Sequence, residues 1–141
     1  MNKKPILCLD FDGVCHQYIS GWQGADVIPD PPIPGLFDFI YKASDFFEIH
    51  IFSSRSNQSG GIDAMRTWFD MYLREWKAGE AHLIDPENID FPELYFDTEK
   101  PSAKVTIDDR AIRFRGVWPN IQSLVDFKPW RIDEVQTMVD R

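Results

Sequence analysis

Two aspartates separated by one residue carry the most specific chemical signal in this sequence. Asp10 and Asp12 directly follow the apolar run 6–9 and precede Gly13. A short apolar run bounded by turn residues is typical of a strand buried on both faces, and side chains two residues apart on a strand point to the same side. Burying two carboxylates is costly unless they bind a cation or take part in a reaction. We therefore expect the end of this strand to be the active site.

Polar residues also follow two other apolar segments that the sequence predicts to be strands. Ser53 ends one of them, and the pair Asp108 and Asp109 ends the other, which a lysine (Lys100 or Lys104) precedes. Open α/β sheets bind their ligands at the carboxyl ends of the strands. Four carboxylates and a lysine at one edge indicate a hard cation, for which Mg²⁺ is the best match, together with an anionic substrate. No cysteine and histidine pair has the spacing of a zinc site.

The rest of the sequence alternates between the patterns of strands and helices. We expect strands over 6–9, 46–52, 94–96 and 105–107, helices over 36–43, 62–79 and 132–139, a helical turn over 118–125 and a loop over 81–92. This alternation predicts one α/β domain spanning residues 1–141, with a doubly wound, mainly parallel sheet and helices on both faces.

Two further features have competing interpretations. The segment 15–34 is rich in glycine, proline and aromatic residues, so it is either a functional loop over the sheet edge or a connector packed by Tyr18 and Trp22. His50 alternates with apolar neighbours in a predicted strand, and we interpret it as a packed or surface histidine rather than a catalyst.

Composition narrows the class of protein. The chain has 141 residues, of which 43% are hydrophobic and 27% charged, which is typical of a globular fold. Its net charge of −8 argues against a broad surface for duplex nucleic acid or anionic membranes. We expect no disulfide between Cys8 and Cys15, no signal peptide, no membrane span and a cytoplasmic location.

Four motifs of the sequence, in order, resemble those of the haloacid dehalogenase superfamily. Residues 7–13 resemble the first motif of its phosphotransferase members, hhhDxDG, in which h is an apolar residue. Residues 49–53 resemble the second, an apolar strand ending in Ser or Thr. The third motif is a lysine, which Lys100 fits better than Lys104 does. Residues 105–109 resemble the fourth, an acidic pair after a strand. Together the motifs cover most of the chain.

The resemblance implies a Mg²⁺-dependent phosphomonoester hydrolase. Asp10 would be the nucleophile and form an aspartyl-phosphate, and Asp12 would protonate the leaving oxygen and then activate water. The metal site would comprise Asp10, the backbone carbonyl of Asp12, and the pair Asp108 and Asp109. Which residue of this pair binds the metal directly is left open. The expected partner is a phosphorylated substrate, and the oligomeric state is left open.

Ser53 and Lys100, with Ser54 beside the former, would bind the transferring phosphoryl oxygens. A weaker similarity concerns the stretches Ser53-Ser54-Arg55 and Asp108-Asp109-Arg110, which resemble parts of the 3′-phosphatase domain of phage polynucleotide kinase-phosphatases. It implies a phosphate contact for Arg55 and a nucleotide or a nucleic-acid 3′-end as the substrate.

The gaps between the motifs leave no room for the cap domain that many members of the superfamily carry. The chain therefore looks like a small uncapped hydrolase, with residues 21–34 as a partial lid. The alternative from another class is a protein that keeps the fold but is catalytically weak, and that binds a ligand or acts only with a partner.

Overall fold

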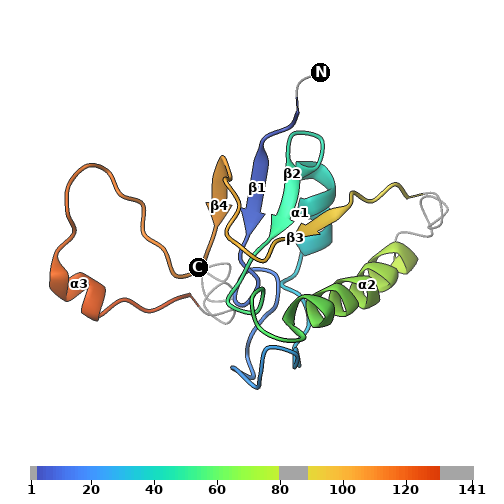
Figure 1. Ribbon diagram of the computed structural model, residues 1–141, viewed down its shortest axis with the longest axis horizontal. Helices are drawn as coiled ribbons and strands as arrows, with labels where there is room; N and C mark the ends of the chain where they lie inside the picture. The colour runs from blue at the N-terminus through green and yellow to red at the C-terminus, as the bar shows by residue number, and fades with distance from the viewer. Residues whose placement is uncertain (1–2, 80–88, 131–141) are drawn as a thin grey trace, which may run out of the picture.

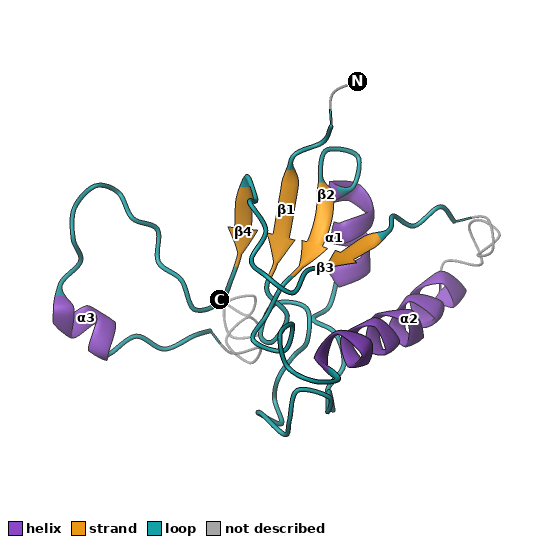
Figure 2. Cartoon of the chain, in the orientation of Figure 1, coloured by secondary structure: helices purple, strands orange, loops and turns teal. Residues whose placement is uncertain are grey.

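The computed structural model describes residues 3–79 and 89–130. Its sheet has four parallel strands, which Figures 1 and 2 show side by side: β1 (Ile6–Leu9), β2 (Glu48–Ile51), β3 (Leu94–Phe96) and β4 (Val105–Ile107). All four predicted strands and the parallel sheet are confirmed. The order β3-β2-β1-β4 places β1 in the interior, between β2 and β4. The chain leaves β1 toward β3 on one side and later returns to β4 on the other, so the carboxyl ends of β1 and β4 flank the position that binds ligands in open α/β sheets.

Two helices, α1 (Leu36–Ala43) and α2 (Gly61–Gly79), pack on one face of this sheet. Alternate residues of β1 and β2 point to that face, and register pairs such as Leu7 with Ile49 share it. These strand residues form one core cluster with the turn after β1 and with both helices: Leu7, Leu9, Phe11, Cys15, Leu36, Phe37, Ile40, Ile49, Ile51, Met65, Trp68 and Phe69. Burying each large apolar side chain contributes roughly 1.5–3 kcal/mol, so the sheet and its helical layer depend on each other for stability.

The opposite face of the sheet carries no helix in the part of the chain that the structure describes. The segment 97–104 crosses this face instead: Asp97 hydrogen-bonds His50 at one end, and the backbone nitrogen of Lys104 donates to the Ile6 carbonyl at the other. A helical crossover needs about a dozen residues or more, and the connection from β3 to β4 is shorter than that. The predicted helices on both faces are therefore not found among these residues. The expected helix over 132–139 and most of the expected loop over 81–92 lie outside the described residues.

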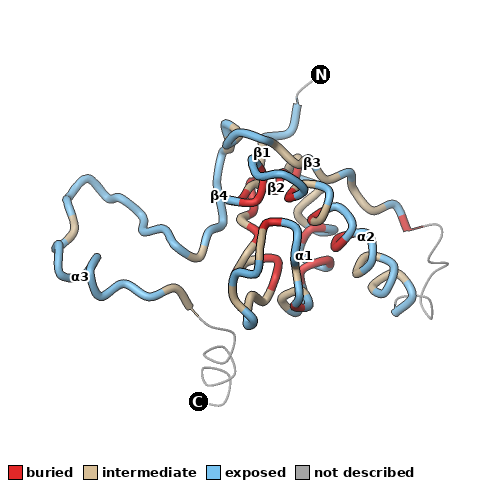
Figure 3. The backbone as a smooth tube through the Cα atoms, turned by 60° about the horizontal axis from the view of Figure 1, so that its bottom comes forward, coloured by how far each residue is buried: buried red, intermediate tan, exposed pale blue. Residues whose placement is uncertain are grey.

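Residues 111–130 form an arm that extends from β4 away from the sheet (Figure 3). The arm contains the short helix α3 (Ile121–Val125), which confirms the second half of the helical turn predicted over 118–125. It returns at Trp130, whose Nε1 donates to the Gly13 carbonyl at 2.9 Å. The large apolar side chains of the arm are exposed: Ile112, Phe114, Val117, Trp118, Ile121, Leu124, Val125 and Phe127.

The start of α2 lies directly against the backbone of the loop that follows β2. A Cβ added at Gly61 would lie 1.9 Å from the carbonyl oxygen of Arg55, and a backbone atom of a buried residue has little freedom to move away. We expect Gly61→Ala to lower the free energy of unfolding by about 1–3 kcal/mol through overpacking, measured by urea denaturation. Gly79→Ala, where an added Cβ meets nothing within 4 Å, is the matched control. Equal stability of the two variants would contradict this packing.

Candidate active site

The turn after β1 holds both aspartates of the first motif. Asp10 donates its backbone N–H to the Ile107 carbonyl at 2.9 Å, which continues the pairing of β1 with β4 beyond the strand. The amides of residues 14–16 all donate to the Phe11 carbonyl and close the turn. Because the Phe11 side chain is fully buried, it fixes the turn in the core, with Asp10 and Asp12 on either side of it in the sequence.

Three carboxylates meet at the carboxyl ends of β1 and β4. Asp10, Asp108 and Asp109 each present an oxygen within 4.8 Å of the other two, as predicted for the first and fourth motifs. Asp108 is exposed, and its Oδ1 accepts from the backbone nitrogen of Arg110 at 2.8 Å. The Oδ1 atom of Asp109 is buried and has no hydrogen-bond partner among the described residues. A buried acceptor without a donor costs about 1–3 kcal/mol, and a bound cation would satisfy it.

The electrostatics of Asp10 reflect this crowding. Burial, the hydrogen bond with Asp109 and the charge of Asp108 raise the pKa of Asp10 from 3.8 to about 8. Burial disfavours the ionised form of Asp10, and the two neighbouring acids disfavour a further negative charge in the cluster. A divalent cation between the carboxylates would reverse the effect, because it favours the ionised forms that bind it. The oxygen-only set of ligands fits Mg²⁺, and Asp10, Asp108 and Asp109 are the residues that would hold it.

Gly13 allows the fourth motif to approach the first. Its φ of +83° lies in the left-handed region, and a Cβ there would lie 2.3 Å from Oδ2 of Asp109. Asp109 therefore packs against the backbone of the turn after β1. The glycine of the DxDG pattern is required here for both conformation and space.

The carboxylate of Asp12 does not belong to the acidic cluster. Two basic side chains, Arg55 and His16, bind it instead. Arg55 donates Nε to Oδ2 at 3.0 Å and to Oδ1 at 3.2 Å, and it donates Nη2 to Oδ1 at 3.1 Å. The Nδ1 atom of His16 lies 2.9 Å from the same Oδ1. Asp12 is thus close to the cluster in the sequence, but Arg55 and His16 bind its carboxylate. A metal contact through the backbone carbonyl of Asp12 stays a prediction.

Arg55 is fully buried, which the sequence did not indicate. Its Nη1 donates to the carbonyls of Gly24, Ala25 and Val27 at 2.8, 3.0 and 3.1 Å. The guanidinium carbon lies 4.7 Å from the centroid of the Trp22 ring. With its donors directed at Asp12 and the loop, this side chain is not placed to bind substrate. The structure therefore does not support the predicted phosphate contact of Arg55, because the guanidinium is buried as a link between loop and turn.

The second motif lies at the same edge of the sheet, immediately after β2. Ser53 is buried: its Oγ accepts from the backbone nitrogen of Arg55 at 3.0 Å, and its own nitrogen donates to Oγ of Ser56 at 3.0 Å. Ser54 is exposed. Serine hydroxyls commonly stabilise local turns in this way. A phosphate contact of Ser53 or Ser54 stays a prediction.

The contacts in the structure do not decide which lysine belongs to the third motif. Lys100 and Lys104 are both exposed, and within residues 3–79 and 89–130 neither side chain forms an ion pair or hydrogen bond. Burial and the charge of Asp97 raise the pKa of the Cys8 thiol, while the Thr106 hydroxyl and the charge of Lys100 act against them. Lys100 is therefore close enough to the crossed face of the sheet to influence β1. The choice between the two lysines stays open.

The contacts of the segment 15–34 are those of a packed connector, and a functional role of this loop stays a prediction. Trp22 packs on Arg55 as a connector residue would. The same loop also supplies His16 and Asp30, which sequence reasoning missed and which lie behind Asp12: the backbone nitrogen of Asp30 donates to Nε2 of His16 at 3.0 Å. The only signal for His16 was its position four residues after Asp12. His50 is a packed histidine, as predicted, between Glu48 and Asp97.

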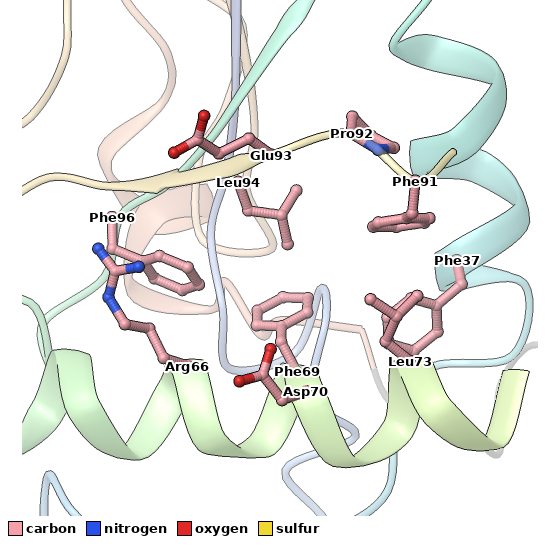
Figure 4. A pocket seen from close by; sticks show the side chains of 10 residues that line it. All are labelled: Phe37, Arg66, Phe69, Asp70, Leu73, Phe91, Pro92, Glu93, Leu94 and Phe96. Carbon is pink, nitrogen blue, oxygen red and sulfur yellow. The ribbon is translucent and has the colours of Figure 1, made fainter. Parts of the chain in front are cut away.

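A pocket of about 250 Å³ lies between α2 and β3, away from the acidic cluster (Figure 4). Apolar side chains, four of them aromatic, line most of it, and three of the lining residues are charged: Phe37, Arg66, Phe69, Asp70, Leu73, Phe91, Pro92, Glu93, Leu94 and Phe96. None of these residues belongs to the four motifs. We therefore assign this pocket to the packing of α2 against the edge of the sheet rather than to the reaction.

Comparison of the chain with protein-family models, with curated proteins and with solved structures found no match in any of the three. The two cysteines are free thiols, as expected. Within the described ranges, no helix has the length and apolar character needed to cross a bilayer.

Proposed function

We propose that this chain is a Mg²⁺-dependent phosphomonoester hydrolase of the haloacid dehalogenase type, with Asp10 as the nucleophile. The observation that carries the proposal is the meeting of Asp10, Asp108 and Asp109, together with the buried Oδ1 of Asp109, which no donor reaches within residues 3–79 and 89–130. These carboxylates lie at the carboxyl ends of the two strands that flank the ligand position of an open α/β sheet. We extend the proposal to the fold: a doubly wound, uncapped core of that superfamily.

The proposed reaction has two steps. A carboxylate oxygen of Asp10 attacks the phosphorus, the bond from phosphorus to the leaving oxygen breaks, and Asp12 gives that oxygen a proton. Asp12 then takes a proton from water as the water oxygen attacks the aspartyl-phosphate. This step breaks the bond from phosphorus to Asp10 and releases inorganic phosphate. Bound Mg²⁺ would offset the charge repulsion between phosphate and the acidic cluster.

Phosphate release tests this proposal directly. The panel comprises an aryl phosphate, sugar phosphates, nucleotides and a 3′-phosphorylated oligonucleotide, each with Mg²⁺ and with chelator. We expect turnover that requires Mg²⁺ and falls to background in Asp10→Asn. Asp70→Asn, on the exposed side of α2, is the matched control and should retain full activity. Turnover of Asp10→Asn at the wild-type rate would exclude Asp10 as the nucleophile. The best substrate separates a small-molecule enzyme from one that acts on nucleic-acid ends.

A second candidate is a catalytically weak protein of the same fold that acts only with a partner. The arm at residues 111–130 favours it, because apolar side chains on this scale are seldom left exposed in a monomer. A groove of about 450 Å³ beside α1, lined by apolar residues such as Leu7, Phe47 and Val105, is also uncovered among the described residues. Mg²⁺ binding without turnover on any member of the panel would favour this candidate over the first.

A further inference from the structure

Behind Asp12 lies a chain of hydrogen bonds whose members the four motifs do not include. The Asp30 carboxylate accepts from the backbone nitrogen of Ser20 at 2.7 Å and from its Oγ at 2.6 Å. The Asp30 carbonyl accepts from Nε1 of Trp68 at 3.0 Å, which fixes the same residue to α2. The backbone nitrogen of Asp30 is thereby held in place and donates to Nε2 of His16.

This contact determines which nitrogen of His16 carries the proton. Because Nε2 accepts from a backbone N–H, it must present a lone pair, and in a neutral imidazole the proton then resides on Nδ1. Nδ1 lies 2.9 Å from Oδ1 of Asp12 and donates to it. The ring cannot turn away from this arrangement, since it is fully buried, stacked on Phe11 at 5.5 Å and packed edge-on against Trp68.

The two oxygens of Asp12 consequently differ. In the described part of the chain, Oδ1 receives His16 Nδ1 and two nitrogens of Arg55, whereas Oδ2 receives only Nε of Arg55. A carboxylate oxygen has two acceptor sites, so Oδ1 is saturated and Oδ2 retains a free one. Only Oδ2 is left to exchange a proton with the leaving oxygen or with water.

We propose that His16 is a positioning residue for Asp12: its buried Nδ1–H occupies Oδ1 and so directs Oδ2 toward the reacting oxygen. This inference rests on the proposed hydrolase function. His16 itself is buried and does not touch substrate, so its effect is confined to the two proton transfers of Asp12, to the leaving oxygen and from water.

The test compares two variants on two substrates. His16→Asn places an amide N–H near the position of Nδ1, whereas His16→Leu fills the space without a donor. An alkyl phosphate needs protonation of its leaving oxygen, but a nitrophenyl phosphate does not. We expect His16→Leu to lower kcat/KM for the alkyl phosphate about 10- to 100-fold, with little change in kcat/KM for the nitrophenyl ester, and His16→Asn to recover most of the loss. The ratio kcat/KM reports the first step, in which only the alkyl leaving oxygen needs the proton of Asp12. In an Asp12→Asn background, His16→Leu should have no further effect.

Equal losses of kcat/KM on both substrates, or a further loss in the Asp12→Asn background, would show a structural role only and overturn the inference while leaving the hydrolase proposal intact. A wild-type chain without Mg²⁺-dependent turnover would overturn both. Nitrogen NMR of the imidazoles of the folded wild type is independent of activity and of variant stability. The chain has three histidines, so His16 can be assigned with His16→Asn. A proton on Nε2 instead of Nδ1 would refute the proposed contact.

Discussion

Replacing Arg55 with methionine is expected to lower the free energy of unfolding by about 3–5 kcal/mol, because it removes a fully buried cation from the Asp12 carboxylate, whose side chain is only 15% exposed. Asp12 would lose every donor except His16, and the carbonyls of Gly24, Ala25 and Val27 would lose the nitrogen that they share. For a domain whose total stability is about 5–15 kcal/mol, such a loss is large.

Arg55→Lys should also destabilise the chain. An ammonium group is a compact donor and cannot reach Asp12 and the loop carbonyls at once, as the planar guanidinium does. Urea denaturation measures the stability of both variants. Hydrogen exchange of residues 20–30 should show loss of protection in this loop before global unfolding, because Arg55 connects it to the turn after β1.

Arg66→Met is the matched control for this prediction. Arg66 is exposed on α2 and stacks over the Phe96 ring at 4.7 Å, so its removal should cost no more than about 1 kcal/mol. If Arg55→Met were as stable as Arg66→Met, the buried network around Asp12 would not contribute to folding in the way its geometry indicates.

The spacing of apolar residues along the sequence was enough to predict the strands and the two longer helices. The apolar run before Asp10 correctly predicted β1, and the helical spacing of apolar residues correctly predicted α1 and α2. The meeting of Asp10 with Asp108 and Asp109 was also predicted, since parallel strands deliver their carboxyl ends to one edge.

The failures concern contacts between residues distant in the sequence. A buried Arg55 could not be inferred, because its partners Asp12, Gly24, Ala25 and Val27 lie in another loop, and arginine is almost always exposed. Among the residues that the structure describes, no helix lies on the second face of the sheet, because the 97–104 connection is too short to contain one. The length of this connection can be read from the sequence, whereas the alternation of strand and helix patterns alone predicts helices on both faces.

Mg²⁺ is expected to raise the melting temperature of the chain, and by more at about pH 8 than at about pH 4. Between these values the native chain keeps a proton on Asp10, whose pKa is raised to about 8 mainly by burial, whereas the unfolded chain releases it near 3.8. At this site the native state therefore binds more protons in this window, and the contribution of Asp10 to stability in chelator falls as the pH rises. Mg²⁺ binds the ionised carboxylates, so it competes with protons at low pH and offsets the loss of stability at high pH.

Asp10→Asn separates this effect from general titration. The amide cannot ionise, so the variant should lose much of the decrease in stability between about pH 4 and about pH 8 in chelator, and its shift with Mg²⁺ should be smaller. Asp70→Asn, exposed on α2, should behave as the wild type does. Sodium chloride at matched ionic strength controls for screening of the surface charges.

Three results are distinguishable in this experiment. A Mg²⁺ shift that depends on pH and on Asp10 supports a cation held by the cluster, whether or not the chain turns over phosphate esters. A shift of the same size in wild type and Asp10→Asn would place the cation elsewhere on this acidic chain. No shift at all would mean that Oδ1 of Asp109, to which no described residue donates, is not a cation ligand, and the proposed hydrolase would lose the observation on which it rests.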